Sequence, residues 1–119
     1  MKDLLEKLKS LDPTTYKRFT ETELAEYEYD DENGSIADYI YQEDLIDSAK
    51  LAWLQACLQE AIGGKGWQGI VLFDKEHNRA VIEDIIDGWG GTRKLSEEIG
   101  SSPAESLLAA YIAACEAMT

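Results

Sequence analysis

Hydrophobic residues recur at helical spacing at the start of the chain. They predict a short amphipathic helix over residues 2–11. The sequence Asp12-Pro13 ends this helix, because the residue before a proline disfavours helical backbone. The residues on the apolar side are Leu4, Leu5, Leu8 and Leu11.

A longer helical pattern occupies the middle of the chain, from residue 36 to residue 62, with a bend expected near Gln42. Ser35 can cap it. Gly63-Gly64 ends it, where left-handed backbone is favoured. Its apolar stripe consists of Ile46, Ala49, Trp53, Ala56 and Cys57, flanked by Leu45, Leu54, Leu58 and Ala61.

Two short runs rich in β-branched residues follow, WQGIVLF and RAVIEDII, separated by the polar connector DKEHN. This pattern predicts a β-hairpin. One face of the hairpin can hold Ile70, Leu72, Val81 and Ile85. After a second turn at residues 87–91, the run TRKLSEEIG fits either a third strand or a short helix that ends at Gly100.

A last helix is predicted from Pro103 onward. Ser102 occupies the capping position and Glu105 completes a capping box. Its buried stripe consists of Leu108, Tyr111, Ile112 and Cys115. The pattern as a whole predicts one α+β domain over residues 1–119. In it, a small antiparallel sheet of two or three strands is packed by a long central helix and a C-terminal helix, with an N-terminal helical acidic segment.

The distribution of charge along the chain indicates more about function than the overall composition does. The 119-residue chain has a formal charge of −13, and residues 21–47 carry eleven carboxylates without a single Lys or Arg. Thr20 and Glu23 have the form of a capping box, so a helical segment is expected to begin at Glu21 and to break at Asn33-Gly34. The negative electrostatic potential of these eleven carboxylates repels nucleic acid and anionic membranes, and it attracts basic protein surfaces.

Residues 21–47 therefore form the candidate binding surface, for which we expect a basic protein partner and neither nucleic acid nor membrane. If helical, they would present about one carboxylate per 3.7 Å. That density is close to the ~3.4 Å charge spacing of one DNA strand. The alternative is a solvated surface, since charge runs commonly serve solubility. The absence of interspersed Lys or Arg favours the interface. The predicted contact residues are Glu21, Glu23, Glu26, Tyr27, Glu28, Tyr29, Asp30, Asp31, Glu32, Asp38, Tyr41, Glu43 and Asp44.

The sequence offers no pattern that supports catalysis, a metal or a cofactor. A nucleophilic mechanism would need the single histidine, His77, beside Cys57 or Cys115, and nothing in the sequence places them together. Both cysteines lie in apolar helical runs, which favours buried reduced thiols in a cytoplasmic protein, with a disulfide between neighbouring helices as the alternative. An EF-hand register on Gly34 fails, because Tyr29 and Ile40 replace the required carboxylates.

Two further patterns have the outline of known motifs. RKLSEEIGSSPAESLLAAY has the outline of a helix-turn-helix, but its second helix carries no basic residue to read a base edge. The glycine-rich run GGKGWQG lacks the Lys-Ser/Thr ending of a phosphate-binding loop. Neighbouring carboxylates such as Glu83 with Asp84 are common, but a glycosidase-type pair must share one cleft. We therefore expect a protein that is not an enzyme.

The ending SPAESLLAAYIAACEAM after a short sheet, with Trp67 and Trp89 near the turns, resembles small phage-encoded proteins with an α-β-α sandwich. Size, acidity and the lack of a catalytic motif also resemble phage anti-CRISPR proteins, many of which block a nucleic-acid-binding effector by occupying its basic surfaces. The resemblance implies an inhibitor of a bacterial CRISPR effector that acts in the host cytoplasm. Its acidic residues, such as Glu28, Asp30 and Asp31, would meet Lys and Arg on the target. The alternatives are an immunity protein that neutralises a toxin nuclease, a phage accessory protein and a small hydrolase.

Overall fold

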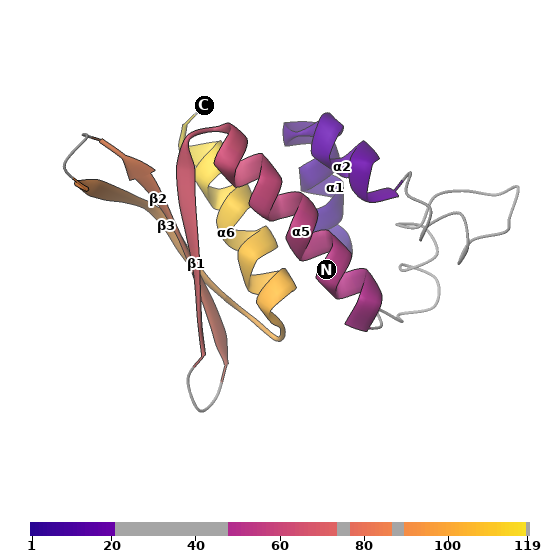
Figure 1. Ribbon diagram of the computed structural model, residues 1–119. Coiled ribbons are helices and arrows are strands. Elements are labelled where there is room, and N and C mark those ends of the chain that lie inside the picture. The colour runs from indigo at the N-terminus through magenta and orange to yellow at the C-terminus, as the bar shows by residue number, and fades with distance from the viewer. Residues whose placement is uncertain (21–47, 74–76, 87–89, 119) are drawn as a thin grey trace, which may run out of the picture.

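The computed structural model describes residues 1–20, 48–73, 77–86 and 90–118 (Figure 1). Their elements follow in the order α1 (Lys2–Leu11), α2 (Pro13–Thr20), α5 (Ser48–Gly64), β1 (Trp67–Phe73), β2 (Asn78–Ile85), β3 (Thr92–Gly100) and α6 (Pro103–Ala117). The expected helical acidic segment, and the part of the expected central helix before Ser48, lie outside the described residues.

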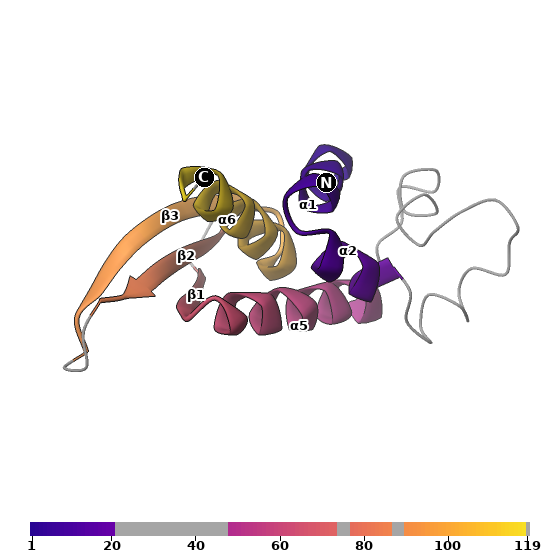
Figure 2. The same ribbon diagram turned by 90° about the horizontal axis from the view of Figure 1, so that it is seen from above.

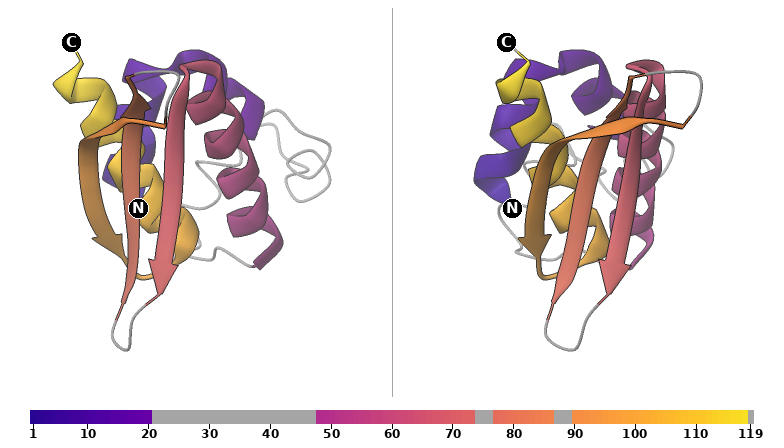
Figure 3. Two further views of the ribbon diagram at one scale, coloured as in Figure 1. Left: turned by 60° about the vertical axis from the view of Figure 1, so that its left-hand side comes forward. Right: turned by 90° about the vertical axis from the view of Figure 1, so that its left-hand side faces the viewer.

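The strands form one antiparallel sheet in the order β1-β2-β3. Ile70 lies opposite Val81 in the hairpin, and Val81 lies opposite Glu97 in the second pair. The hairpin prediction is thus confirmed, and residues 92–100 form a strand. Helices α5 and α6 lie on one side of this sheet (Figures 1 and 3), which confirms the expected α+β class.

The two faces of the sheet differ in what covers them. On the helix side, Ala80 and Ile82 are fully buried, and Trp67 packs its ring edge-on against Tyr111 of α6. The residues expected to share a face do so: Ile70 pairs with Val81, and their neighbours alternate accordingly. Their face, however, is the one that the described helices leave open (Figure 3, right), where Leu72 and Ile85 are about half exposed.

The close approach of the helices requires small residues at particular positions on the helix side of the sheet. A Cβ atom at Gly69 would stand only 3.3 Å from Cδ1 of Ile62 in α5. The helices can approach the sheet this closely because β1 and β2 present Gly69 and Ala80 to them. Alternation along a strand assigns residues to two faces, but it does not state which face is covered.

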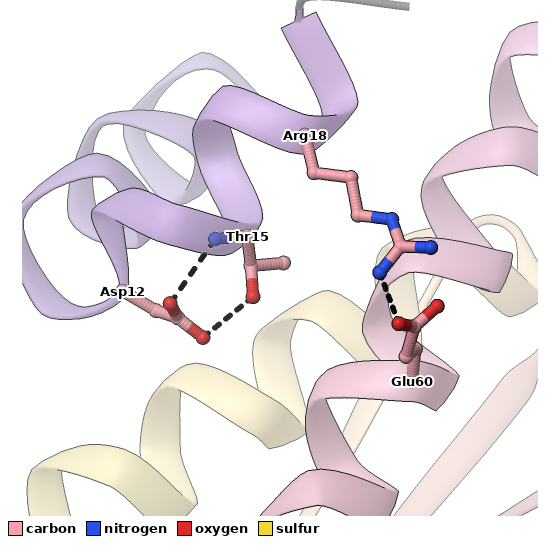
Figure 4. Close-up of polar contacts among 4 residues, drawn as sticks. All are labelled: Asp12, Thr15, Arg18 and Glu60. Atoms are coloured by element: carbon pink, nitrogen blue, oxygen red, sulfur yellow. Dashed lines mark hydrogen bonds and ion pairs between the residues drawn. The ribbon is translucent and has the colours of Figure 1, made fainter.

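Helix α2, which follows α1 directly, was not predicted from the sequence. Asp12 ends α1, and its carboxylate also caps α2: Oδ1 accepts from the Thr15 backbone N–H at 3.1 Å and Oδ2 from the Thr15 hydroxyl at 2.6 Å (Figure 4). Pro13 fills the first helical position, where its missing N–H carries no penalty. The same dipeptide that stops one helix therefore starts the next. Thr20, predicted to begin a helix, ends α2 and donates its hydroxyl to the Tyr16 carbonyl at 3.0 Å.

Helix α5 differs from expectation at its end and in its buried side. It continues through Gly63 and Gly64, and the left-handed residue is Gly66, with φ of 75°. Ala56, expected on the buried stripe, is exposed. The buried residues of the described part of α5 are Lys50, Leu54, Cys57, Leu58 and Ile62.

Helix α6 is the most buried element. Ser102 caps it by accepting from the Glu105 N–H at 3.1 Å, as predicted. The Glu105 carboxylate, however, accepts from the backbone N–H and hydroxyl of Ser101. The predicted stripe of Leu108, Tyr111, Ile112 and Cys115 is buried throughout. Together with Leu5 and Leu8 of α1, Phe19 of α2, Leu58 of α5 and Ile82 of β2, it forms one hydrophobic cluster.

Candidate functional site

The predicted acidic surface begins where α2 ends and finishes where α5 begins. All its candidate contact residues, from Glu21 to Asp44, lie outside the described residues. The described ends that flank it can be located: the C-terminal end of α2 and the N-terminal end of α5 both lie at the end of the molecule remote from the sheet (Figures 1 and 2). The acidic segment is thus connected at both ends to this helical end.

An ion pair joins the two helices that flank the acidic segment. Arg18 of α2 contacts the Glu60 carboxylate of α5 (Figure 4). The hydrogen bond that the Arg18 guanidinium donates to Glu60 raises the pKa of Arg18, which is charged at every physiological pH. Phe19 and Leu58, in the same two helices, belong to the core cluster. The flanking helices are therefore joined to each other by both apolar and ionic contacts.

Other cations among the described residues also have interaction partners. Lys50, near the start of α5, is only 3% exposed and has an interaction partner, as does Lys17 in the last turn of α2. Further ion pairs join Lys7 to Glu116 at 4.0 Å, Arg79 to Glu97 at 3.8 Å, Arg93 to Asp84 at 2.9 Å and Lys94 to Glu97 at 3.5 Å. Exposed pairs of this kind add little stability. They do show that charges of both signs are mixed on the described surface.

The two cysteines are free, buried thiols, as expected. Burial raises the pKa of Cys57 to about 11, and burial also raises the pKa of Cys115. The charged neighbours that act on Cys57 are Arg18 and Glu60. A thiol with a raised pKa is a poor nucleophile, so this arrangement does not support cysteine catalysis.

The neighbouring carboxylates Glu83 and Asp84 do not face one cleft. Glu83 and Asp84 are consecutive on β2 and therefore point to opposite faces, and Asp84 is bound to Arg93. Within the described ranges, no group of three or more His, Cys, Asp or Glu side chains is placed to hold a metal ion. The helix-turn-helix outline corresponds to β3 followed by α6, so its first helix is a strand.

Tyr111 is fully buried, and no sequence pattern predicts the contact that its hydroxyl makes. Its hydroxyl donates to Asp12 Oδ2 at 2.5 Å, which links α6 to the corner between α1 and α2. Burial and the hydrogen bond to Asp12 raise the pKa of this phenol. Tyr111 therefore remains a proton donor, and its position between helices indicates a structural role.

Two hollows mark the described surface. One, of about 620 Å³, lies between α1 and α6 and is lined by Asp3, Glu6, Lys7, Ser10, Leu11 and Glu116. The other, of about 250 Å³, lies beside β1 and is lined by Gln59, Ile62, Gly63, Trp67, Gly69, Val71 and Leu107. The first is lined mainly by charged and polar side chains. The second has an apolar lining at the edge of the sheet.

Comparison of the chain with protein-family models, with curated proteins and with solved structures gave no match. Among the helices that the structure describes, none combines the length and the apolar character needed to cross a bilayer.

Proposed function

We propose that this protein is a non-enzymatic inhibitor that uses residues 21–47 to bind the basic, nucleic-acid-binding surface of another protein. An RNA-guided CRISPR effector is the leading target. The proposal depends on the distribution of charge. Outside residues 21–47 the chain carries thirteen Asp or Glu against eleven Lys or Arg, a formal charge of −2. The segment therefore holds eleven of the thirteen excess negative charges.

The structure supports this reading through the described part of the chain. There, cations and carboxylates pair with one another, as in Arg18 with Glu60 and Arg93 with Asp84. The net negative charge of the chain is therefore concentrated in residues 21–47. A concentrated anionic segment accelerates encounter with a Lys- and Arg-rich groove and competes there with phosphate.

Cleavage of target DNA by purified effectors tests the proposal. A panel of RNA-guided effector complexes is incubated with the protein before target DNA is added, and cleavage and DNA binding are measured at about 50 and 200 mM salt. We expect inhibition of at least one effector, with weaker binding at the higher salt because screening shortens the range of the field. A basic toxin nuclease in the same panel tests the immunity-protein alternative.

Two variants of equal charge separate a local interface from net charge. The first neutralises Glu28→Gln, Asp30→Asn, Asp31→Asn and Glu32→Gln. The control neutralises four carboxylates of the described surface, Asp3→Asn, Glu6→Gln, Glu83→Gln and Glu98→Gln. We expect the first to weaken inhibition at least ~10-fold and the control less than ~3-fold, since only contacting charges are specific to the interface. Equal loss in both variants would contradict the proposal.

A further inference from the structure

The two edges of the sheet are protected to different degrees. Strand β3 carries Arg93, Lys94, Glu97 and Glu98, and its register against β2 shifts between Ile82 and Glu83. Charges and bulges of this kind keep an edge strand from pairing with another chain. Strand β1, with the sequence WQGIVLF, has no charge, no proline and an unbroken seven-residue register. It is an edge without these protective features.

The surroundings of β1 indicate a place for an added strand. The hollow of about 250 Å³ lies on the helix side of β1, against Gly69, and α5 and α6 supply its other walls through Ile62 and Leu107. Figure 3 shows α5 extending past the outer edge of β1 on that side. At the end of the strand, Phe73 is 73% exposed and Leu72 is 48% exposed. Large apolar side chains and a hollow thus occur together at one strand edge.

We propose that β1 pairs antiparallel with β1 of a second copy of this chain, with Ile70 opposite Ile70 of the second copy. The two three-stranded sheets would then form one six-stranded sheet. This register is the one that uses all seven residues of the strand. It places Trp67 opposite Phe73, Gln68 opposite Leu72 and Gly69 opposite Val71 of the second copy.

Each of these pairs has a physical reason. The Val71 side chain of the second copy would stand beside Gly69, which has none, and next to the hollow. The exposed Phe73 would meet Trp67, and aromatic cross-strand pairs stabilise antiparallel sheets. Open main-chain groups along both edges would gain partners, as in other cases of strand addition.

Charge favours this edge over charged surfaces as the place where two copies can meet. Two molecules of formal charge −13 repel each other, and the repulsion is least where uncharged surfaces meet. Strand β1 carries no charge, and the ends of α2 and α5 that flank the acidic segment lie at the opposite end of the molecule (Figure 1). Pairing through β1 therefore keeps the two attachment points of each acidic segment away from the interface.

Sedimentation equilibrium of the full chain over about 1–200 µM, at about 150 mM salt, tests the association. We expect a concentration-dependent dimer. Ile70→Lys places two like charges opposite each other and should raise the dissociation constant at least ~10-fold. The matched control is Ile99→Lys in β3, which adds the same charge on the same face of the sheet. It should change the dissociation constant less than ~3-fold. A chain that stays monomeric throughout, or equal effects of both variants, would overturn the proposal. Circular dichroism verifies that each variant is folded.

Cross-linking tests the register itself. Ile70→Cys would bring two thiols directly opposite each other, at a Cβ separation of about 5 Å. Leu72→Cys would leave its two thiols more than ~10 Å apart, beyond the reach of a disulfide. Under mild oxidation we expect disulfide-linked dimers of Ile70→Cys, and few of Leu72→Cys or Ile99→Cys. The native Cys57 and Cys115 are buried and leave a low background. Comparable cross-linking at all three positions would also overturn the proposal.

Discussion

The Tyr111 hydroxyl donates a hydrogen bond to the Asp12 carboxylate across 99 residues of sequence. Asp12 simultaneously accepts from the backbone and the hydroxyl of Thr15. One carboxylate therefore caps α2 and joins the α1–α2 corner to α6. Because α2 also packs on α5, this contact contributes to the position of one attachment point of the acidic segment.

Removing the hydroxyl tests the importance of this link. Tyr111→Phe should lower the free energy of unfolding by about 1–3 kcal/mol, because a buried hydrogen bond to a charged acceptor is lost while the ring is retained. Tyr16→Phe is the control, because Tyr16 is only partly buried and its ring contacts Lys9. It should change stability by less than ~0.5 kcal/mol. Urea denaturation measures both, and equal effects would argue against the link.

Asp12 should also make stability depend on pH. Burial raises the pKa of its carboxyl, but the hydrogen bonds from Thr15 and Tyr111 outweigh burial and hold the pKa below 3.8. Because the pKa of Asp12 is lower in the folded than in the unfolded state, its ionised carboxylate stabilises the fold fully above the unfolded-state pKa. This stabilisation is lost as pH falls through the folded-state pKa. The stability difference between wild type and Asp12→Asn should therefore be constant from pH 7 to 5 and shrink below about pH 4. Urea titrations at pH 7, 5 and 3 measure it, and a difference that grows on acidification would contradict the assignment.

The thiols should be protected in the native protein. A pKa of about 11 for Cys57, against 9.0 for an ordinary thiol, lowers its thiolate fraction at pH 8 about 100-fold. Its 2% exposure limits access further. We expect modification of Cys57 and Cys115 by iodoacetamide at pH 8 to be at least ~100-fold slower in the native protein than in 6 M guanidinium, as followed by peptide mass spectrometry. Rapid native labelling of either thiol would show that its helix opens readily.

Gly100 is predicted to be essential for docking α6 on β3. A Cβ atom there would lie 2.5 Å from the Ser106 backbone nitrogen and 2.9 Å from its Cα, so backbone atoms would have to move. Gly100→Ala should destabilise the protein by more than ~2 kcal/mol. Gly64→Ala is the matched control, because a Cβ atom at Gly64 meets nothing within 4 Å, and we expect it to be neutral or stabilising. Thermal denaturation compares them, and similar melting temperatures would refute the steric argument.

Local patterns predicted the elements whose signals lie within one helix or one hairpin. The leucines of α1, the Ser102-Pro103 start of α6 and the alternation of β1 and β2 are all short-range features, and the corresponding elements are confirmed. The acidic segment was recognised by charge alone. Its proposed role remains a prediction, because its residues lie outside those the structure describes.

What only the tertiary structure decided were relations between distant parts of the chain. Alternation grouped Ile70 with Val81, but the close approach of α5 and α6 over Gly69 and Ala80 determined that this face stays open. The Asp12 contact with Tyr111, and the exposure of the uncharged β1 as a sheet edge, likewise arise only after packing. A sequence pattern states which side chains share a face of an element. Which of those faces and edges become covered depends on where the other elements pack.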